Sequence, residues 1–98
     1  MGQSHANAEV REFVLLNKYG MHVRPAGLFA KVASRFNADV DVEKDGNVVS
    51  GKSIMALMTL EAVCGTKLRV TASGPQGREV LDELEALVLR KFDIPDEQ

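Results

Sequence analysis

A histidine and an arginine lie two residues apart in the segment GMHVRPA, at residues 20–26. Pro25 suits the first turn of a helix, because its missing N–H would have no acceptor there. A helix start offers free backbone N–H groups and the positive end of the helix dipole to an anion. Imidazole is largely a neutral nucleophile at pH 7, and the Arg24 guanidinium can bind phosphoryl oxygens. The segment is therefore compatible with a phosphoryl carrier at His22, and the alternative is a histidine that only caps a helix beside a solvated arginine.

A second segment, GNVVSGKS at residues 46–53, matches the G-x-x-x-x-G-K-[ST] signature of a nucleotide-binding loop. A functional loop of this kind follows a buried parallel strand and curves tightly around phosphates. Here the preceding segment alternates and is charged, Asp45-Gly46 favours a hairpin turn, and Val48-Val49 favour extended backbone. We therefore reject ATP binding at this segment.

Ser53 suits the N-cap of a short helix that is apolar nearly all round. One arc of this helix is expected to face the core. The adjoining arc contains two flexible methionines and an isoleucine: Ile54, Met55 and Met58. This second arc is either additional core or a patch for a partner, since methionine suits adaptable surfaces. A phosphate on Ser53 would place about −1.5 to −2 charge beside the arc, whereas capping alone would also explain the serine.

Cysteine and histidine are too few for a metal centre. Cys64 is the only cysteine, which excludes an internal disulfide and a Cys-rich metal site. Its position near the end of a predicted helix favours a small buried apolar residue over a catalytic thiol. His5 and His22 are the only histidines, and zinc would need further ligands at suitable spacing. We expect no metal and no cofactor.

The element order of the chain predicts an α+β fold. Alternating apolar residues predict strands over residues 9–16, 39–43, 47–50 and 67–72. Helical spacing predicts helices over residues 25–36, closed by Asn37, over 54–63, closed by Gly65, and over 75–88. Alternation within each strand indicates that only one sheet face is covered. We expect an open-faced β-sandwich, a four-stranded antiparallel sheet covered on one face by three helices in the order β-α-β-β-α-β-α, although a ferredoxin-like module could share this order.

Composition limits the classes of function. The chain has 98 residues, of which 45% are hydrophobic and 27% charged, as expected for one globular domain. A net charge of −2 argues against a sequence-independent nucleic-acid binder that relies on a general positive field, and it leaves a local basic patch open. No apolar run approaches the ~20 residues of a membrane span, and no signal peptide opens the chain, so we expect a cytoplasmic protein. We expect a disordered extension over residues 1–8, a domain over 9–92 and a frayed tail over 93–98.

Three stretches together resemble HPr, the histidine-containing phosphocarrier family of the bacterial phosphoenolpyruvate-dependent sugar phosphotransferase system. Residues 17–26 are similar to the active-site segment of that family, and residues 51–60 are similar to its regulatory segment. Ser73-Gly74-Pro75 before an amphipathic helix is also similar to the family pattern. The resemblance covers residues 9–91, and the open-faced sandwich is the fold that it implies.

The resemblance implies a role for each matching residue. His22 would be phosphorylated through Nδ1, Arg24 would steady the phosphoryl group, and the backbone amides of Val23 and Arg24 would contribute. Ser53 matches the regulatory serine, and the sequence around it is similar to HPr from bacteria with an ATP-dependent HPr kinase. Phosphorylation of Ser53 would slow phosphoryl uptake from enzyme I, with a transcriptional regulator as a further partner.

Partner docking is expected on one exposed face of the first helix, formed by Arg24, Gly27 and Lys31 beside the arc of Ile54, Met55 and Met58. Gly27 stands where many relatives carry alanine, which leaves partner preference open. The implied activity is that of a carrier rather than an enzyme: a monomer that receives its phosphoryl group from enzyme I and donates it to sugar-specific IIA domains.

Three alternatives remain. A nitrogen-related or regulatory HPr paralogue would share His22 but serve regulators instead of sugar transport. A regulation-only module would act through Ser53, which the presence of His22 argues against. A ferredoxin-like nucleic-acid-binding module would need aromatic stacking residues on the open sheet face, and only 5% of the residues are aromatic.

Overall fold

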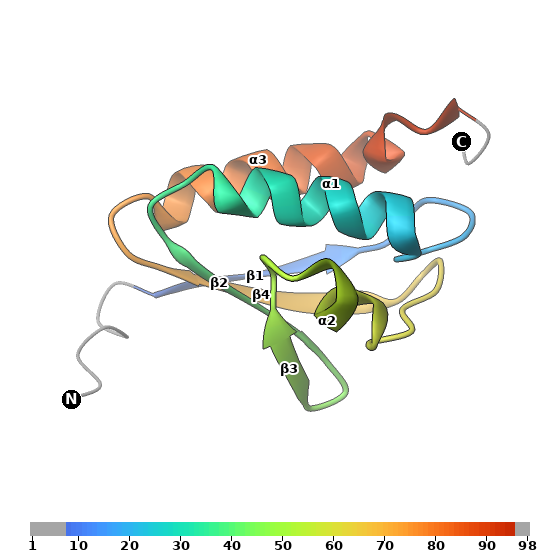
Figure 1. The fold of residues 1–98 in the computed structure, drawn as a ribbon, viewed down its shortest axis with the longest axis horizontal. Helices are drawn as coiled ribbons and strands as arrows, with labels where there is room; N and C mark the ends of the chain where they lie inside the picture. Colours follow the sequence, from blue (N-terminus) through green and yellow to red (C-terminus); the bar gives the residue numbers. More distant parts are fainter. Residues whose placement is uncertain (1–7, 96–98) are drawn as a thin grey trace.

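The fold is built on one four-stranded antiparallel sheet. The structure is a computed structural model, and it describes residues 8–95. The strands lie side by side in the order β1-β4-β2-β3 (Figure 1). Their bounds are Glu9–Val14 for β1, Asp39–Lys44 for β2, Asn47–Ser50 for β3 and Lys67–Ser73 for β4. Side chains alternate between the two faces, and one face is buried, with Phe13, Val40, Val42, Leu68 and Val70.

Helices cover that buried face and leave the opposite face of the sheet open (Figure 1). They are α1 (Val23–Ser34), α2 (Ile54–Met58) and α3 (Gly77–Leu89), followed by a short 3-10 turn, η2 (Lys91–Asp93). The helices α1 and α3 lie next to each other above the sheet, and α2 packs against α1 and β3. The predicted α+β open-faced sandwich and its element order are confirmed.

Helix α1 begins two residues before the predicted start. Its N-cap is His22, so Pro25 is the third helical residue and not the first. Proline is tolerated there because the N–H groups of the first turn have no intrahelical acceptor. The helix ends at Ser34 with Arg35 as its C-cap, before the predicted Asn37. The earlier start places His22 at the helix boundary itself.

Helix α2 ends at Met58, whereas the apolar spacing predicts it to continue to residue 63. Glu61 has a φ of 51°, which interrupts a right-handed helix. Gly65 does adopt the left-handed region, with a φ of 90°, but it lies in the turn before β4 and not at a helix end. Cys64 is exposed in this turn, so the expectation of a buried apolar cysteine is wrong.

The β2–β3 hairpin turns at Asp45 and Gly46, as the sequence predicts. Their φ values of 51° and 86° are both positive, as a two-residue type I′ turn requires. The residues that follow form β3, including Val48 and Val49. The segment that matches the nucleotide-binding signature is therefore partly an extended strand, which agrees with the rejection of ATP binding there.

Arg11 joins helix α3 to the edge strand β1. Its Nη1 lies 2.7 Å from Asp82 Oδ1 and 2.9 Å from Glu85 Oε1. The hydrogen bond to Asp82 raises the pKa of the Arg11 guanidinium above its ordinary value. This pair of contacts fixes α3 against the sheet at the edge farthest from β3.

The chain stays packed beyond α3. Phe92 and Ile94 are each 1% exposed and belong to the hydrophobic core, so the packed chain extends past the domain boundary predicted at residue 92. Most of the predicted extension, residues 1–7, and the last three residues of the predicted tail lie outside the described residues. Within residues 8–95, every helix is too short or too polar to span a bilayer.

Candidate functional site

His22 occupies the start of helix α1. As the N-cap residue it has an extended backbone, with φ −83° and ψ −170°. The first bond of the helix runs from the Ala26 N–H to the His22 carbonyl oxygen at 3.0 Å. The N–H groups of Val23 and Arg24 precede that bond and have no acceptor within the helix. The first turn has no acidic residue and the His22 side chain does not cap it, so the helix start is open to an anion.

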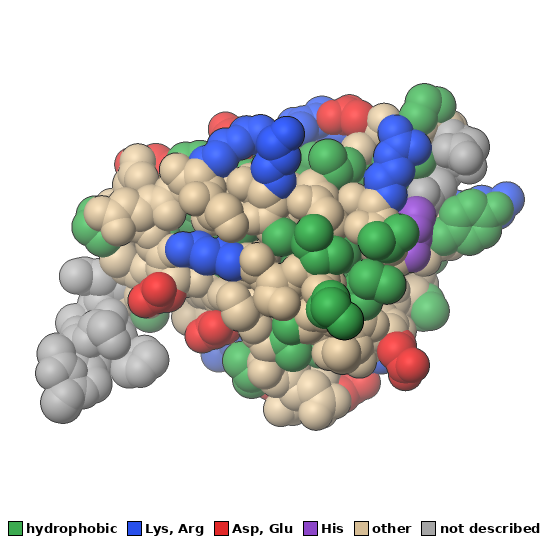
Figure 2. Space-filling model, viewed as in Figure 1, with side chains coloured by type: hydrophobic (Ala, Val, Ile, Leu, Met, Phe, Trp, Pro, Cys, Tyr) green, Lys and Arg blue, Asp and Glu red, His purple; other side chains and the backbone are tan. Residues whose placement is uncertain are grey.

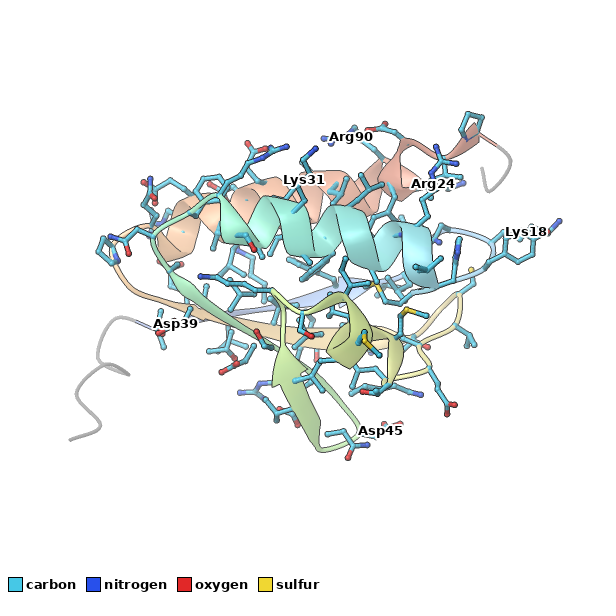
Figure 3. All side chains as sticks on the ribbon, in the orientation of Figure 1. Lys18, Arg24, Lys31, Asp39, Asp45 and Arg90 are labelled. Carbon is cyan, nitrogen blue, oxygen red and sulfur yellow. The ribbon has the colours of Figure 1, made fainter. Side chains whose placement is uncertain are left out.

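Arg24 is exposed at the second position of α1, two residues after His22. It borders a groove of about 380 Å³ between α1 and α3, together with Lys31 and Arg90. Figure 3 shows these three labelled cations on the helical side of the molecule, while Asp39 and Asp45 lie at the sheet. A guanidinium placed there offers a bidentate fork to oxygens that approach the helix start.

The loop before α1 fixes how the chain reaches His22. Asn17 is fully buried, and its Nδ2 donates a hydrogen bond to the Gly20 carbonyl oxygen at 2.8 Å. Gly20 has a φ of 66°, and a Cβ at this position would collide with the carbonyl oxygen of Ala62. The N–H of buried Met21 donates to that same Ala62 carbonyl at 2.8 Å. The residue before His22 is thus both buried and hydrogen-bonded.

Residues 59–66, which we call the support loop, form the other side of this contact. Besides the Ala62 carbonyl, the support loop contributes the Gly65 N–H, which donates to the Leu15 carbonyl at 2.7 Å. The Leu15 N–H in turn donates to the Thr66 carbonyl at 3.0 Å. The loop that presents His22 is therefore held along its length by a segment far away in the sequence.

Tyr19 forms the outer rim of the site. Its ring meets the His22 ring edge to face, with centroids 6.2 Å apart and planes at 82°. The ammonium of Lys18 lies 5.2 Å from the centroid of the same tyrosine ring, a cation–π contact. Tyr19 is exposed, so the aromatic ring borders the imidazole without covering it.

Acidic residues are absent from the two stretches of sequence that form α1 and α2. Between Glu12 and Asp39 the sequence contains no acidic residue and four cations, which are Lys18, Arg24, Lys31 and Arg35. Between Asp45 and Glu61 it again contains no acidic residue. Helices α1 and α2 both lie within these stretches. An anionic group or an acidic partner would therefore meet no carboxylate on either helix.

Ser53 is the N-cap of α2, as predicted. Its side-chain oxygen accepts a hydrogen bond from the Ala56 N–H at 3.2 Å. The residue is half-buried, and α2 is only five residues long. In this conformation the Ser53 side-chain oxygen caps the first turn of α2.

Ile54, Met55 and Met58 form an exposed group on α2, which we call the apolar patch. Met55 is 79% exposed, and the other two are about half as exposed. Figure 2 shows hydrophobic side chains (green) gathered beside the histidine (purple) on this face of the molecule. A patch of this kind next to the candidate phosphoryl acceptor fits a surface that partners cover transiently.

The predicted docking face of α1 is divided between two sides of the helix. Gly27 faces α2, because a Cβ on it would lie 3.8 Å from Ile54 Cδ1. Arg24 and Lys31 instead border the groove toward α3. Val23, at the first helical position, is exposed. The structure thus brings Gly27 to the apolar patch and places the two cations along a different edge of α1.

Sequence reasoning missed the residues that support the histidine. Asn17 and Gly20 lie in the stretch that resembles the active-site segment of the family, residues 17–26, but the sequence pattern assigns neither of them a role of its own. Tyr19 belongs to the same stretch, and nothing in the sequence pattern marks Ala62 as the acceptor for Met21. These contacts join segments that only the folded chain brings together.

The arrangement combines a nucleophilic imidazole, free first-turn amides and a guanidinium, and it is suited to holding a phosphoryl group on a ring nitrogen. Among residues 8–95, no three His, Cys, Asp or Glu side chains come together as ligands for a metal ion. The imidazole, the amides and the guanidinium are compatible with group transfer to and from the histidine.

Comparison with known proteins points to the same chemistry. Residues 10–89 match the family described as PTS HPr component phosphorylation site. The chain is 46% identical over 71 residues to the HPr-like protein Crh of Bacillus subtilis, covering 72% of this chain and 84% of that protein. It is 37% identical to the phosphocarrier protein HPr of Treponema pallidum, covering 86% and 96%. The crystal structure of HPr-C-His from Thermoanaerobacter tengcongensis superposes with a TM-score of 0.84 at 36% identity, covering 88% and 97%.

Proposed function

This chain belongs to the HPr family of phosphocarrier proteins, and from that membership we propose that His22 accepts a phosphoryl group from phosphorylated enzyme I and passes it to sugar-specific IIA domains. The observation that carries this proposal is the open start of α1, where the His22 side chain does not cap the helix and no carboxylate lies in the first turn. The protein is a phosphocarrier and not an enzyme, because each phosphoryl group it receives leaves again on its partner.

The transfer forms one bond and breaks one bond in each direction. The lone pair of His22 Nδ1 attacks the phosphorus, and the bond between phosphorus and the donor breaks with its electron pair returning to the donor. The proton on Nε2 is released to water as the ring becomes the neutral phosphoimidazole. Transfer to the IIA domain reverses these steps, with the acceptor on the partner as the new nucleophile.

Three groups of this chain support the phosphohistidine in the proposal. The amides of Val23 and Arg24 donate to phosphoryl oxygens, since the helix provides them with no other acceptor. The Arg24 guanidinium adds a charged fork and balances part of the negative charge. The exposed position of Arg24 allows it to follow the phosphoryl group as a partner approaches.

Regulation at Ser53 is part of the proposal. An HPr kinase would transfer phosphate to the serine hydroxyl, placing about −1.5 to −2 charge at the edge of the apolar patch. Docking of enzyme I would weaken because the patch is otherwise apolar and free of acidic residues. The new phosphoserine would also offer a transcriptional regulator a charged group to bind.

A second function is favoured by one observation, the 46% identity to the HPr-like protein Crh. In this alternative the chain is a regulatory or nitrogen-related paralogue that acts mainly by binding regulators. The two functions differ in where the phosphoryl group goes after it leaves enzyme I. Incubating the phosphorylated chain with purified sugar-specific IIA domains separates them, because only the carrier function discharges it.

Intact-mass spectrometry tests the proposed acceptor. After incubation with enzyme I and phosphoenolpyruvate, the wild-type chain is expected to gain a single phosphoryl group that is stable in alkali and lost in acid. His22→Ala should gain none, while Ser53→Ala, the matched variant at the other predicted site, should gain the same group as wild type. An adduct that survives in His22→Ala would contradict the assignment.

A further inference from the structure

Lys44, the last residue of β2, reaches across to the support loop. Its Nζ donates to the Leu60 carbonyl oxygen at 3.0 Å and to the Glu61 carbonyl oxygen at 3.3 Å. These two carbonyls follow α2, at the start of the support loop, 16 and 17 residues along the chain from Lys44. The Lys44 ammonium group therefore joins the end of β2 to the support loop, which is hydrogen-bonded to the loop before His22.

Lys44 binds the chain directly after α2, where the negative end of the helix dipole lies. The last carbonyls of the helix itself already accept backbone N–H groups, from Thr59, Leu60 and Glu61. Helix α2 has no basic residue in its own last turn. A helix of five residues has little stability of its own and depends on contacts with the rest of the fold. Lys44 supplies a cation from another element to the two carbonyls that follow the helix, through hydrogen bonds strengthened by its charge.

The conformation that follows also depends on outside contacts. Glu61 has a φ of 51°, a region that residues with side chains adopt at a cost. Its carbonyl oxygen is one of the two that Lys44 binds. The next residue, Ala62, provides the carbonyl that accepts the Met21 N–H at 2.8 Å, and Met21 directly precedes His22.

We propose that Lys44 is a positioning residue for phosphoryl transfer: by holding the Leu60 and Glu61 carbonyls, it sets the Ala62 carbonyl that orients the backbone before His22. The same contact holds the residues that directly follow the helix that carries the apolar patch. The proposal rests on the proposed function for the choice of His22 as acceptor, but the contact itself can be tested without phosphorylation.

The variant Lys44→Met removes the donors and keeps an apolar stem of similar length. Lys44→Arg keeps a charged donor, and Lys67→Met is the matched control, because Lys67 is an exposed lysine at the start of β4. Amide hydrogen exchange of Met21 reports the contact with Ala62, and exchange of buried Val70 in the central strand β4 reports global unfolding. Rapid-quench measurement of phosphoryl uptake from enzyme I gives the functional readout.

Loss of the charged hydrogen bonds in Lys44→Met should speed Met21 exchange about 10-fold relative to Val70 exchange. Phosphoryl uptake should fall about 3- to 10-fold, within the range that small misplacements of a reacting group produce. Lys44→Arg should recover most of both effects, and Lys67→Met should show neither.

Equal Met21 exchange in Lys44→Met and Lys67→Met would overturn the proposal. Faster exchange with unchanged uptake would also overturn it, because Lys44 would then be only structural. If Lys44→Met is too unstable to study, Lys44→Gln provides the same readouts with a neutral donor. If wild type gains no phosphoryl group, the proposed function fails. The Met21 exchange and the ¹⁵N shifts of the His22 ring, compared between wild type and Lys44→Met, then still decide whether Lys44 positions this histidine.

Discussion

Helices α1 and α2 begin at half-buried residues, His22 and Ser53, whose side chains are arranged differently. Helix α1 begins at His22, whose side chain does not cap the first turn. Helix α2 begins at Ser53, whose side-chain oxygen accepts from the Ala56 N–H at 3.2 Å. The residue before His22 is also held in place, by the hydrogen bond from the Met21 N–H to the Ala62 carbonyl oxygen. The start of α2 is capped by its own side chain, whereas the start of α1 is not capped and follows a hydrogen-bonded residue, Met21.

Under the proposed function, this difference separates the phosphoryl chemistry at α1 from partner docking at α2. An open, positively biased helix start is suited to an anion that arrives and leaves. A self-capped start on a short helix is suited to presenting apolar side chains, since Ile54, Met55 and Met58 follow it directly. Phosphorylation of Ser53 would alter the second region without touching the first. The comparison therefore predicts different consequences for changes at each start.

The largest expected effect on stability comes from the contact between Gly20 and Ala62, in the loop before α1. Gly20→Ala forces a side chain into a φ of 66° and against the Ala62 carbonyl oxygen. The free energy of unfolding should fall by about 2–4 kcal/mol, from the backbone conformation together with the displaced loop. Thermal unfolding monitored by circular dichroism should show a midpoint lower by roughly 10–20 °C.

Gly46→Ala is the matched control for this change. Gly46 has a similar φ of 86°, but a Cβ there would meet nothing within 4 Å. The variant should lose only about 1–2 kcal/mol, the cost of the left-handed backbone alone. Equal losses in the two variants would show that contact with Ala62 does not matter at Gly20.

The architecture was predictable from the sequence, whereas the contacts that support the site were not. Strand alternation and the Asp45-Gly46 turn are local signals, and they led to the correct sheet. The start of α1 was misplaced because proline fits any position in the first turn. The length of α2 was overestimated because apolar spacing continues past Met58, while the positive φ of Glu61 depends on the folded environment.

Part of the candidate site can be predicted from the chemistry of its residue types. The types of His22 and Arg24 and their position before a proline were sufficient to nominate them. The hydrogen bonds from Met21 to Ala62 and from Lys44 to the support loop join distant segments. No periodicity encodes such a backbone contact, because any residue can supply the carbonyl.

A smaller effect on stability is expected at Ser53, the N-cap of α2. Ser53→Ala removes the acceptor of the Ala56 N–H, so the free energy of unfolding should fall by about 1 kcal/mol. Urea unfolding can measure this loss. Ser34→Ala, at the end of α1, is the control and should change stability by less than about 0.5 kcal/mol. No loss in Ser53→Ala would mean that α2 is not held by its cap, and the contrast between the two starts would weaken.

The smallest effect is expected where the two helices meet. Gly27→Ala should raise the free energy of unfolding by about 0.5–1 kcal/mol, because alanine favours the helix and its Cβ would lie at an ordinary contact distance of 3.8 Å from Ile54 Cδ1. A chemical denaturation curve shifted to higher denaturant would support this. A shift to lower denaturant would show that α1 and α2 need glycine for their close approach.

The most direct test of the central claim is a ¹H–¹⁵N correlation spectrum of the chain before and after phosphorylation by enzyme I. If the phosphoryl group on His22 is held by the open start of α1, the amide signals of Val23 and Arg24 should move strongly downfield. The Ala56 amide, which the Ser53 side chain already binds, should stay in place. Phosphorylation that leaves the Val23 and Arg24 amides unmoved would contradict the account.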